Sequence, residues 1–97
     1  MKVKVRLMAL PVLAKAMGGK QAEVEFPGET VADLVDHLVE RYGKPAKEAL
    51  LDEEGQLDAI IQILVNEKQW VVHDRLEVPL KDGDTVIFML LVVGGQR

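Results

Sequence analysis

The sequence contains no cysteine, and this absence excludes several kinds of chemistry together. Without a thiol the chain forms no disulfide bond, binds no metal through sulfur and offers no thiolate nucleophile. Serine is absent as well, so the neighbours His73 and Asp74 have no conventional hydroxyl to activate other than Thr30 or Thr85. Both threonines fit structural positions, the first at a helix start and the second in a strand. We therefore expect no catalytic residue.

Positive charge and long apolar runs are also scarce. The formal net charge is -4, which argues against nucleic acid because phosphate binding needs a basic patch. Lys2, Lys4 and Arg6 alternate along one segment, as on a solvated strand face. The longest apolar run, residues 86–93, is far shorter than the roughly 20 residues of a membrane helix, and the first ten residues lack signal-peptide features. We expect a soluble cytoplasmic protein with no nucleic-acid and no membrane partner.

What the chain does contain suffices for one small domain. Its 97 residues are 48% hydrophobic and 29% charged, which is too apolar a composition for disorder. A chain of this length buries roughly 60–68% of its unfolded surface. We assign residues 1–93 to a single domain and residues 94–97 to a flexible carboxyl-terminal tail.

The first strands are predicted from alternation of apolar and polar residues. Residues 2–8 and 22–26 have the period of two that half-buried strands show. Between them, Pro11 predicts a short helical turn that Gly18-Gly19 ends. Residues 60–65 are β-branched and apolar, which predicts a third strand.

The second half of the chain predicts a hairpin and a final strand. Asn66-Glu67 fits a tight turn, and a weaker strand follows around residues 70–72. Trp70 could contact a partner there, but we expect it to be packed because tryptophan is usually largely buried. Residues 80–84 form a turn before a last strand at 85–91.

Residues 31–42 form the clearest predicted helix. Thr30 suits the N-cap, and Asp33 three residues later approaches a capping box. One stripe faces a core: Val31, Leu34, Val35, Leu38, Val39 and Tyr42. The opposite side carries Asp33, Asp36, His37 and Glu40, for which a solvated face is the better interpretation than a metal site. Together with the strands, this helix predicts an α+β fold of two layers, a mixed sheet packed on one main helix.

The last third of the sequence resembles the ubiquitin-like sulfur carriers of the MoaD/ThiS type. That family has a Val-Asn turn, a Pro-Leu-Lys-Asp-Gly-Asp motif, a hydrophobic strand and Gly-Gly. The matching positions here are Val65-Asn66, 79–84, 86–93 and Gly94-Gly95. The front half agrees more loosely. The resemblance implies a ubiquitin-like β-grasp fold.

The resemblance also implies a protein cosubstrate rather than an enzyme. An E1-like adenylyltransferase would use ATP to adenylate the carboxylate of Gly95, and a sulfur donor would convert the adenylate into a thiocarboxylate. The tail, Gly94 and Gly95, would then enter a sulfur-accepting enzyme such as the large subunit of molybdopterin synthase. The carrier itself would bind no permanent cofactor and no metal. As the pathway that receives the sulfur, molybdopterin or tungstopterin synthesis is favoured, and thiazole synthesis, cysteine synthesis and tRNA thiolation stay open.

Two features depart from the family pattern. The molybdopterin branch commonly has Pro-Pro before its last residues, where this chain has apolar residues 90–93. Gln96 and Arg97 follow Gly95 and add roughly 7 Å of extended chain, so the terminal carboxylate is not glycine's. Some carriers of the family lose such residues to a zinc-dependent peptidase. We therefore expect Gln96 and Arg97 to be removed.

Strand alternation also predicts a docking face. If Val86 and Phe88 face the core, the neighbouring residues point to the other side of the sheet. Four apolar residues are then predicted to be exposed and to bind a partner: Leu64, Ile87, Met89 and Leu91. A register slip of one residue would exchange the two sets.

Two other functions stay open. The presence of Gln96 and Arg97 favours a ubiquitin-like interaction domain, or a protein modifier, that does not carry sulfur. A small enzyme has the least support, because no catalytic constellation is found.

Overall fold

The computed structural model describes residues 1–72 and 74–90. The predictions for Leu91, Gly94, Gly95, Gln96 and Arg97 lie outside the described residues, as do His73 and the predicted boundary between domain and tail.

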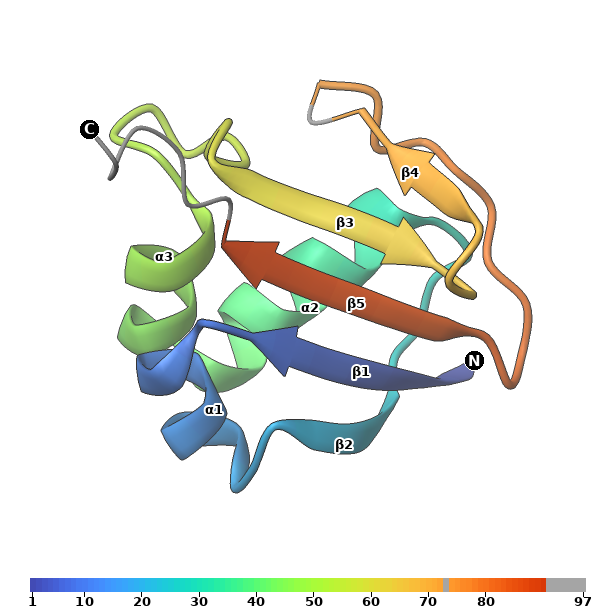
Figure 1. Ribbon diagram of the computed structural model, residues 1–97, viewed down its shortest axis with the longest axis horizontal. Coiled ribbons are helices and arrows are strands. Elements are labelled where there is room, and N and C mark those ends of the chain that lie inside the picture. The colour runs from blue at the N-terminus through green and yellow to red at the C-terminus, as the bar shows by residue number, and fades with distance from the viewer. Residues whose placement is uncertain (73, 91–97) are drawn as a thin grey trace.

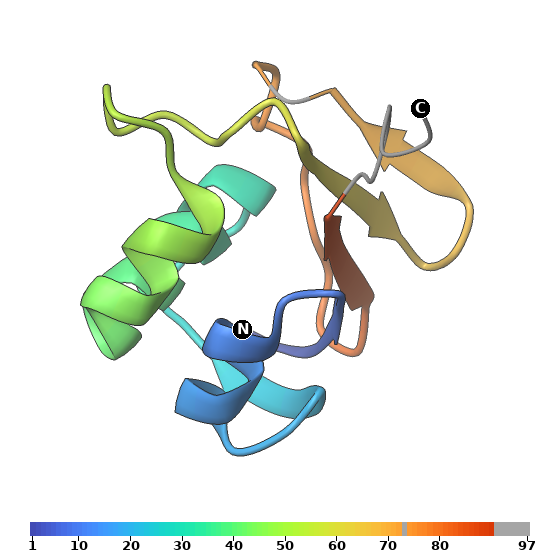
Figure 2. The ribbon, with the colours of Figure 1, turned by 60° about the vertical axis from the view of Figure 1, so that its left-hand side comes forward.

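The described residues form a five-stranded mixed sheet and three helices, and the helices lie on one face of the sheet (Figures 1 and 2). The strand order is β2-β1-β5-β3-β4, with β5 parallel to β1 and the other neighbours antiparallel. This two-layer arrangement confirms the expected α+β class and the ubiquitin-like β-grasp fold. The elements are β1 (Lys2–Met8), α1 (Pro11–Met17), β2 (Gln21–Glu25), α2 (Val31–Tyr42), α3 (Lys44–Leu50), β3 (Ile61–Val65), β4 (Gln69–Val71) and β5 (Thr85–Leu90).

Helix α2 begins and ends where its sequence predicts. The Thr30 hydroxyl accepts a hydrogen bond from the Asp33 backbone N at 3.2 Å, and the Asp33 carboxylate accepts one from the Thr30 backbone N at 3.2 Å. This is the reciprocal capping box. Gly43 follows the last helical residue, Tyr42, and its N–H bonds the Val39 carbonyl at 2.8 Å.

The core lies between the inner face of the sheet and the helices. Helix α2 buries four residues of its predicted stripe, while Val39 and Tyr42 are partly buried. The side chains that are 0% exposed include Val5, Leu13, Val31, Leu34, Leu38, Ala46, Leu50, Ile63, Val86 and Phe88. Burial of each large aliphatic or aromatic side chain contributes roughly 1.5–3 kcal/mol, so this layer holds β5 firmly at the centre of the sheet.

Some element boundaries differ from the sequence prediction. Pro45 lies in the first turn of α3, a helix of seven residues, because proline suits a helix start. Ile60 stands outside β3 and is exposed. None of the helices in the described part of the chain is long and apolar enough to cross a membrane.

Candidate functional site

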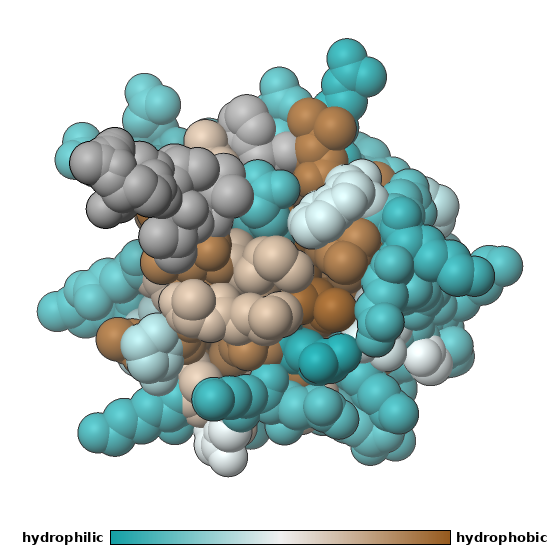
Figure 3. Space-filling model, in the orientation of Figure 1, coloured by the Kyte–Doolittle hydropathy of each residue, from teal (hydrophilic) through white to brown (hydrophobic). Residues whose placement is uncertain are grey.

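The face of the sheet opposite the helices carries an apolar surface. Figure 3 looks onto this face and shows hydrophobic side chains over the middle of the sheet, with hydrophilic residues around them. We call this surface the outer patch; it consists of Met8, Leu64, Trp70, Val72, Ile87 and Met89. An apolar surface with a polar rim is typical of a protein-binding site.

The pairing register places these side chains next to one another. Leu64 lies opposite Ile87 on one side and opposite Trp70 on the other. Met89 lies opposite Met8 in the parallel pairing of β5 with β1. Directly opposite side chains in a sheet are close enough to touch. One row of contacts therefore runs from Ile87 over Leu64 to Trp70, a second joins Met89 to Met8, and the two rows form one continuous surface.

The predicted alternation of β5 is confirmed. Val86 and Phe88 are fully buried on the inner face, whereas Leu64 and Met89 are half-buried on the outer face. A one-residue slip of the register is therefore excluded.

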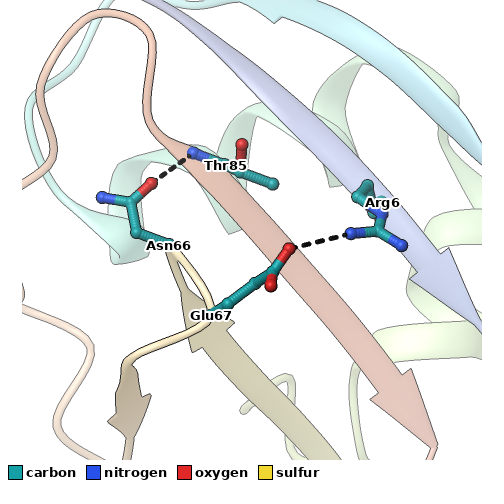
Figure 4. A network of polar contacts seen from close by, with 4 residues as sticks. All are labelled: Arg6, Asn66, Glu67 and Thr85. Atoms are coloured by element: carbon teal, nitrogen blue, oxygen red, sulfur yellow. Dashed lines mark hydrogen bonds and ion pairs between the residues drawn. The ribbon is translucent and has the colours of Figure 1, made fainter.

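The prediction that Ile87 is exposed is wrong, since only 4% of its surface is accessible. Ile87 points to the outer face, but its neighbours across β1 and β3 are Arg6 and Leu64. The Arg6 guanidinium also reaches across β5 to the Glu67 carboxylate, with Nη1 and Oε2 3.4 Å apart (Figure 4). Ile87 therefore forms the floor of the outer patch rather than its surface.

The prediction that Trp70 is packed is also wrong. Its exposed fraction is 57%, because β4 is a three-residue strand at the edge of the sheet that the described residues form. Exposed tryptophan is enriched at binding hot spots. Met8 and Val72 were not predicted as patch residues, although Val72 alternates with the buried Val71 and Met8 lies on the same face of β1 as Arg6; for Trp70, packing was preferred over a partner contact.

The Val-Asn position of the family motif has a structural role at the start of β5. The Asn66 side-chain oxygen accepts a hydrogen bond from the Thr85 backbone N at 2.9 Å (Figure 4), and its amide donates to Asp84 at 3.0 Å. Asn66 and Glu67 have φ of 53° and 59°, the positive values that the two central residues of a type I′ turn require, and the Lys68 N–H closes this turn on the Val65 carbonyl at 3.0 Å. Asn66 thus ties the β3–β4 turn to the root of β5.

The Pro-Leu-Lys-Asp-Gly-Asp segment fixes the same root from the other side. The Leu80 backbone N bonds the Glu29 carbonyl at 2.7 Å, next to the start of α2. The Lys2 backbone N donates to the Asp82 carboxylate at 2.7 Å, and the Gly83 N donates to the Lys2 carbonyl at 2.9 Å. The segment therefore holds β1, β5 and α2 together, and β5 runs from it to the opposite end of the molecule (Figure 1).

The polar side of α2 offers little for metal binding. Asp33 is engaged in the capping box, and the His37 ring lies against Phe26 with centroids 6.1 Å apart. Within residues 1–72 and 74–90, no group of three or more acidic or histidine side chains is placed to hold a metal ion. Hydrogen bonds from the backbone N–H groups, that of Glu29 first and that of Thr30 next, lower the pKa of Asp33, which is the effect expected of a carboxylate that caps a helix.

Comparison with known proteins identifies the family. The model of the ThiS family matches residues 8–95 of this chain. The chain belongs to the ThiS family. The ThiS match ends at Gly95 and leaves Gln96 and Arg97 beyond it.

Relatives of this ThiS-family protein include modifiers and carriers. Ubiquitin-related modifier 1 of Schizosaccharomyces pombe is 28% identical over 97 residues, which are 98% of this chain and 100% of the relative. SAMP1 from Haloferax volcanii has a TM-score of 0.74 at 28% identity, with 98% of this chain and 100% of that chain covered.

Two further solved structures resemble this ThiS-family protein at higher identity. The Amycolatopsis orientalis BexX/CysO complex contains a chain with a TM-score of 0.70 and 34% identity, covering 96% of this chain and 99% of that one. A structure from Pyrococcus furiosus described as molybdopterin converting factor, subunit 1, has a TM-score of 0.67 and 33% identity, covering 95% and 99%. The chain is therefore similar over nearly its whole length to ubiquitin-like sulfur carriers and modifiers.

Proposed function

We propose that this protein carries sulfur as a thiocarboxylate on Gly95, as a cosubstrate of partner enzymes. The observation that carries the proposal is the family match, which ends at Gly95, on a chain whose last described strand leads toward that glycine. Glycines have no Cβ, so a Gly94-Gly95 tail can enter a channel that side chains would block.

The proposed chemistry takes place in two steps on the carboxylate. In the first step, a Gly95 carboxylate oxygen attacks the α-phosphorus of ATP on an E1-like adenylyltransferase, and pyrophosphate leaves. In the second step, hydrosulfide (HS−) released by a sulfur donor attacks the acyl carbon, the C–O bond to the phosphate breaks so that AMP leaves, and loss of the S–H proton yields the thiocarboxylate. The carrier supplies the acyl group and a docking surface, and the partners supply the catalytic side chains.

The proposal requires removal of Gln96 and Arg97. While they are present, the Gly95 carbonyl belongs to a peptide bond and has no carboxylate oxygen to attack ATP. A zinc-dependent peptidase that cuts after Gly95 would expose it. This requirement is supported by the position of the two residues beyond the family match.

We further propose molybdopterin or tungstopterin synthesis as the destination of the sulfur. The likeness to the Pyrococcus furiosus molybdopterin converting factor subunit, at 33% identity over 95% of this chain, supports this choice. The large subunit of molybdopterin synthase would then be the accepting partner, and the outer patch would be its contact surface and that of the adenylyltransferase.

A test of the proposal is AMP formation with the activating enzyme from the same host. The chain that ends at Gly95 should be adenylated, and the chain that ends at Arg97 should not. Gly95→Ala in the shorter chain should abolish adenylation or sulfur transfer, because the methyl group obstructs the channel, and should leave stability unchanged because a terminal residue contributes little to the fold. Absence of adenylation in both chains would refute sulfur carriage, and equal reaction of both would refute the need for trimming.

A second candidate function is protein modification without sulfur carriage. It is favoured by the full-length likeness to ubiquitin-related modifier 1. A modifier joins its activated carboxyl group to a lysine amine of another protein. Isopeptide-linked products without a thiocarboxylate intermediate, detected by mass spectrometry, would favour this candidate over the first.

A further inference from the structure

A groove lies where the described part of β5 ends, next to α1 and α3. The beginning of α1 and the last turn of α3 lie at this end of the molecule (Figure 1). Together with the segment before β3, they enclose a hollow of about 380 Å³. We call it the exit groove, and its apolar lining residues are Ala9, Leu10, Pro11, Val12, Ala49, Ile60 and Leu90.

Two lining residues of the exit groove are unusually exposed for their type. Val12 is 59% and Ile60 is 46% accessible, although both are large aliphatic side chains. Their exposure on either side of one hollow indicates a surface that binds an apolar segment.

The exit groove continues into an acidic hollow. Glu48 and Asp58 line the groove and also a neighbouring hollow of about 690 Å³. Asp52, Glu53 and Glu54 line the second hollow with them, and Lys47 is its cationic lining residue among those described. Glu48 lies 3.9 Å from Lys44 in an exposed pair, which attracts weakly in water. The surface therefore changes from apolar to negatively charged as it leads away from Leu90.

The chain's own carboxyl-terminal residues match this order. Leu91, Val92 and Val93 follow Leu90 directly, and Gly94-Gly95 separates them from Gln96 and Arg97. Seven residues reach roughly 23–25 Å when extended, which is ample for a groove that begins at Leu90. Along the tail the apolar residues come first and the cation comes last. The surface changes from apolar to acidic in the same order.

We propose that the exit groove is the docking site of residues 91–97 of the same chain. Leu91 to Val93 pack on Val12 and Ile60, and the Arg97 guanidinium lies among the carboxylates of Glu48 and its neighbours. A tail held there is withheld from a partner's channel until it is released. This contact is intramolecular and does not rest on sulfur carriage.

The test uses a spin label, which the absence of cysteine makes specific. A nitroxide on Gln96→Cys, with Arg97 retained, should broaden the amide NMR signals of Val12, Ala49 and Ile60 several-fold more than those of the outer patch. Dilution with unlabelled protein distinguishes an intramolecular contact from binding of a second copy.

Matched variants distinguish docking of the tail in the exit groove from broadening that arises only because the label is tethered near Leu90. Val12→Asp should abolish the selective broadening, whereas Val72→Asp, at a residue of equal type that is 56% exposed and lies in the outer patch, should leave it unchanged. Ile60→Asn provides a second groove variant if Val12→Asp fails to fold, and Arg97→Gln should reduce the broadening without a change in the folded core. Broadening spread evenly over residues near Leu90, or lost on dilution, would overturn the proposal.

Discussion

At the scale of single residues, Gly28 shows how tightly the start of α2 is packed. A Cβ at position 28 would lie 2.4 Å from the Cβ of Asp33, which is closer than such atoms approach. Asp33 is held in place because its carboxylate accepts hydrogen bonds from the backbone N of Glu29 at 2.9 Å and of Thr30 at 3.2 Å. Glycine is thus required here by lack of space.

Gly28→Ala should lower the free energy of unfolding by about 1–3 kcal/mol, the usual cost of overpacking. Glu29→Ala, at an exposed neighbour, is the matched control and should change it by less than about 0.5 kcal/mol. Urea denaturation monitored by circular dichroism measures both. An unchanged midpoint for Gly28→Ala would show that the helix start yields to the added methyl.

The capping carboxylate of Asp33 also predicts a pH dependence. Hydrogen bonds from the Glu29 and Thr30 backbone lower its pKa in the folded protein, so ionised Asp33 favours folding. Its stabilisation is present above the unfolded pKa of about 4 and is lost as the pH falls through the lower folded value.

The difference in melting temperature between the native chain and Asp33→Asn should therefore be largest near neutral pH and shrink below about pH 4. Thermal melts over that range measure it. A difference that stays constant with pH would contradict an ionic contribution from the cap.

At the scale of secondary-structure elements, β5 organises the molecule. Its start is fixed by Asn66 and by the 79–84 segment, and β1 and β3 pair with both of its edges. The segment that most resembles the family motif is therefore the anchor of the strand that leads to the tail.

Variants of Asn66 should separate the stability that its side-chain hydrogen bonds contribute from the stability that depends on its backbone conformation. Asn66→Gly keeps the positive φ and loses the bonds to Thr85 and Asp84, for an expected loss of about 1 kcal/mol. Asn66→Ala loses the bonds and strains the left-handed backbone, for about 2–3 kcal/mol. Chemical denaturation compares the two, and equal losses would mean that the backbone conformation relaxes freely.

The features of the fold were predictable to different extents, because some are determined by local sequence signals and others by contacts between segments that are distant in the sequence. The bounds of α2 follow from local signals, its capping box and apolar stripe, and were predicted to the residue. The alternation along β5 was also local and gave the correct inner face. Burial of Ile87 depends on β1, β3 and the Arg6–Glu67 pair, and exposure of Trp70 depends on β4 being the edge strand, so neither could be obtained from local patterns.

Variants of the outer patch should distinguish binding from folding. Trp70→Ala and Met89→Asp should weaken the complex with the activating enzyme at least tenfold in Kd, about 1.4 kcal/mol. Trp70→Ala should leave stability within about 0.5 kcal/mol, and Met89→Asp should leave the fold intact.

Ile87→Asp is the contrasting variant, because it buries a charge in the floor of the patch and should cost about 2–4 kcal/mol of stability. Calorimetric titration and thermal melts measure both properties. Unfolding of Met89→Asp, or unaltered binding by both surface variants, would contradict the assignment of the patch as a docking surface.

At the scale of the whole molecule, the folded layers and the proposed reactive group belong to different parts of the chain. The described residues build a rigid sheet and helix layer with an apolar outer patch, and the proposed reactive atom belongs to Gly95, beyond the end of β5. This division explains why a chain without cysteine or serine belongs to a family of sulfur carriers and modifiers: the reacting group of a carrier is a main-chain carboxylate. The fold was predictable from patterning and resemblance, whereas the proposed modification of the tail would be made by partner enzymes and is not encoded in side-chain geometry.

The most direct test of the proposed sulfur carriage is the intact mass of the protein purified from its native host. We predict a population that lacks Gln96 and Arg97, part of which is heavier by the exchange of one oxygen for one sulfur. Tandem mass spectrometry should place that exchange on Gly95. Sulfur carriage on Gly95 would be contradicted if the protein always retained Gln96 and Arg97. It would also be contradicted if the trimmed protein never gained sulfur while the host synthesised molybdopterin or tungstopterin.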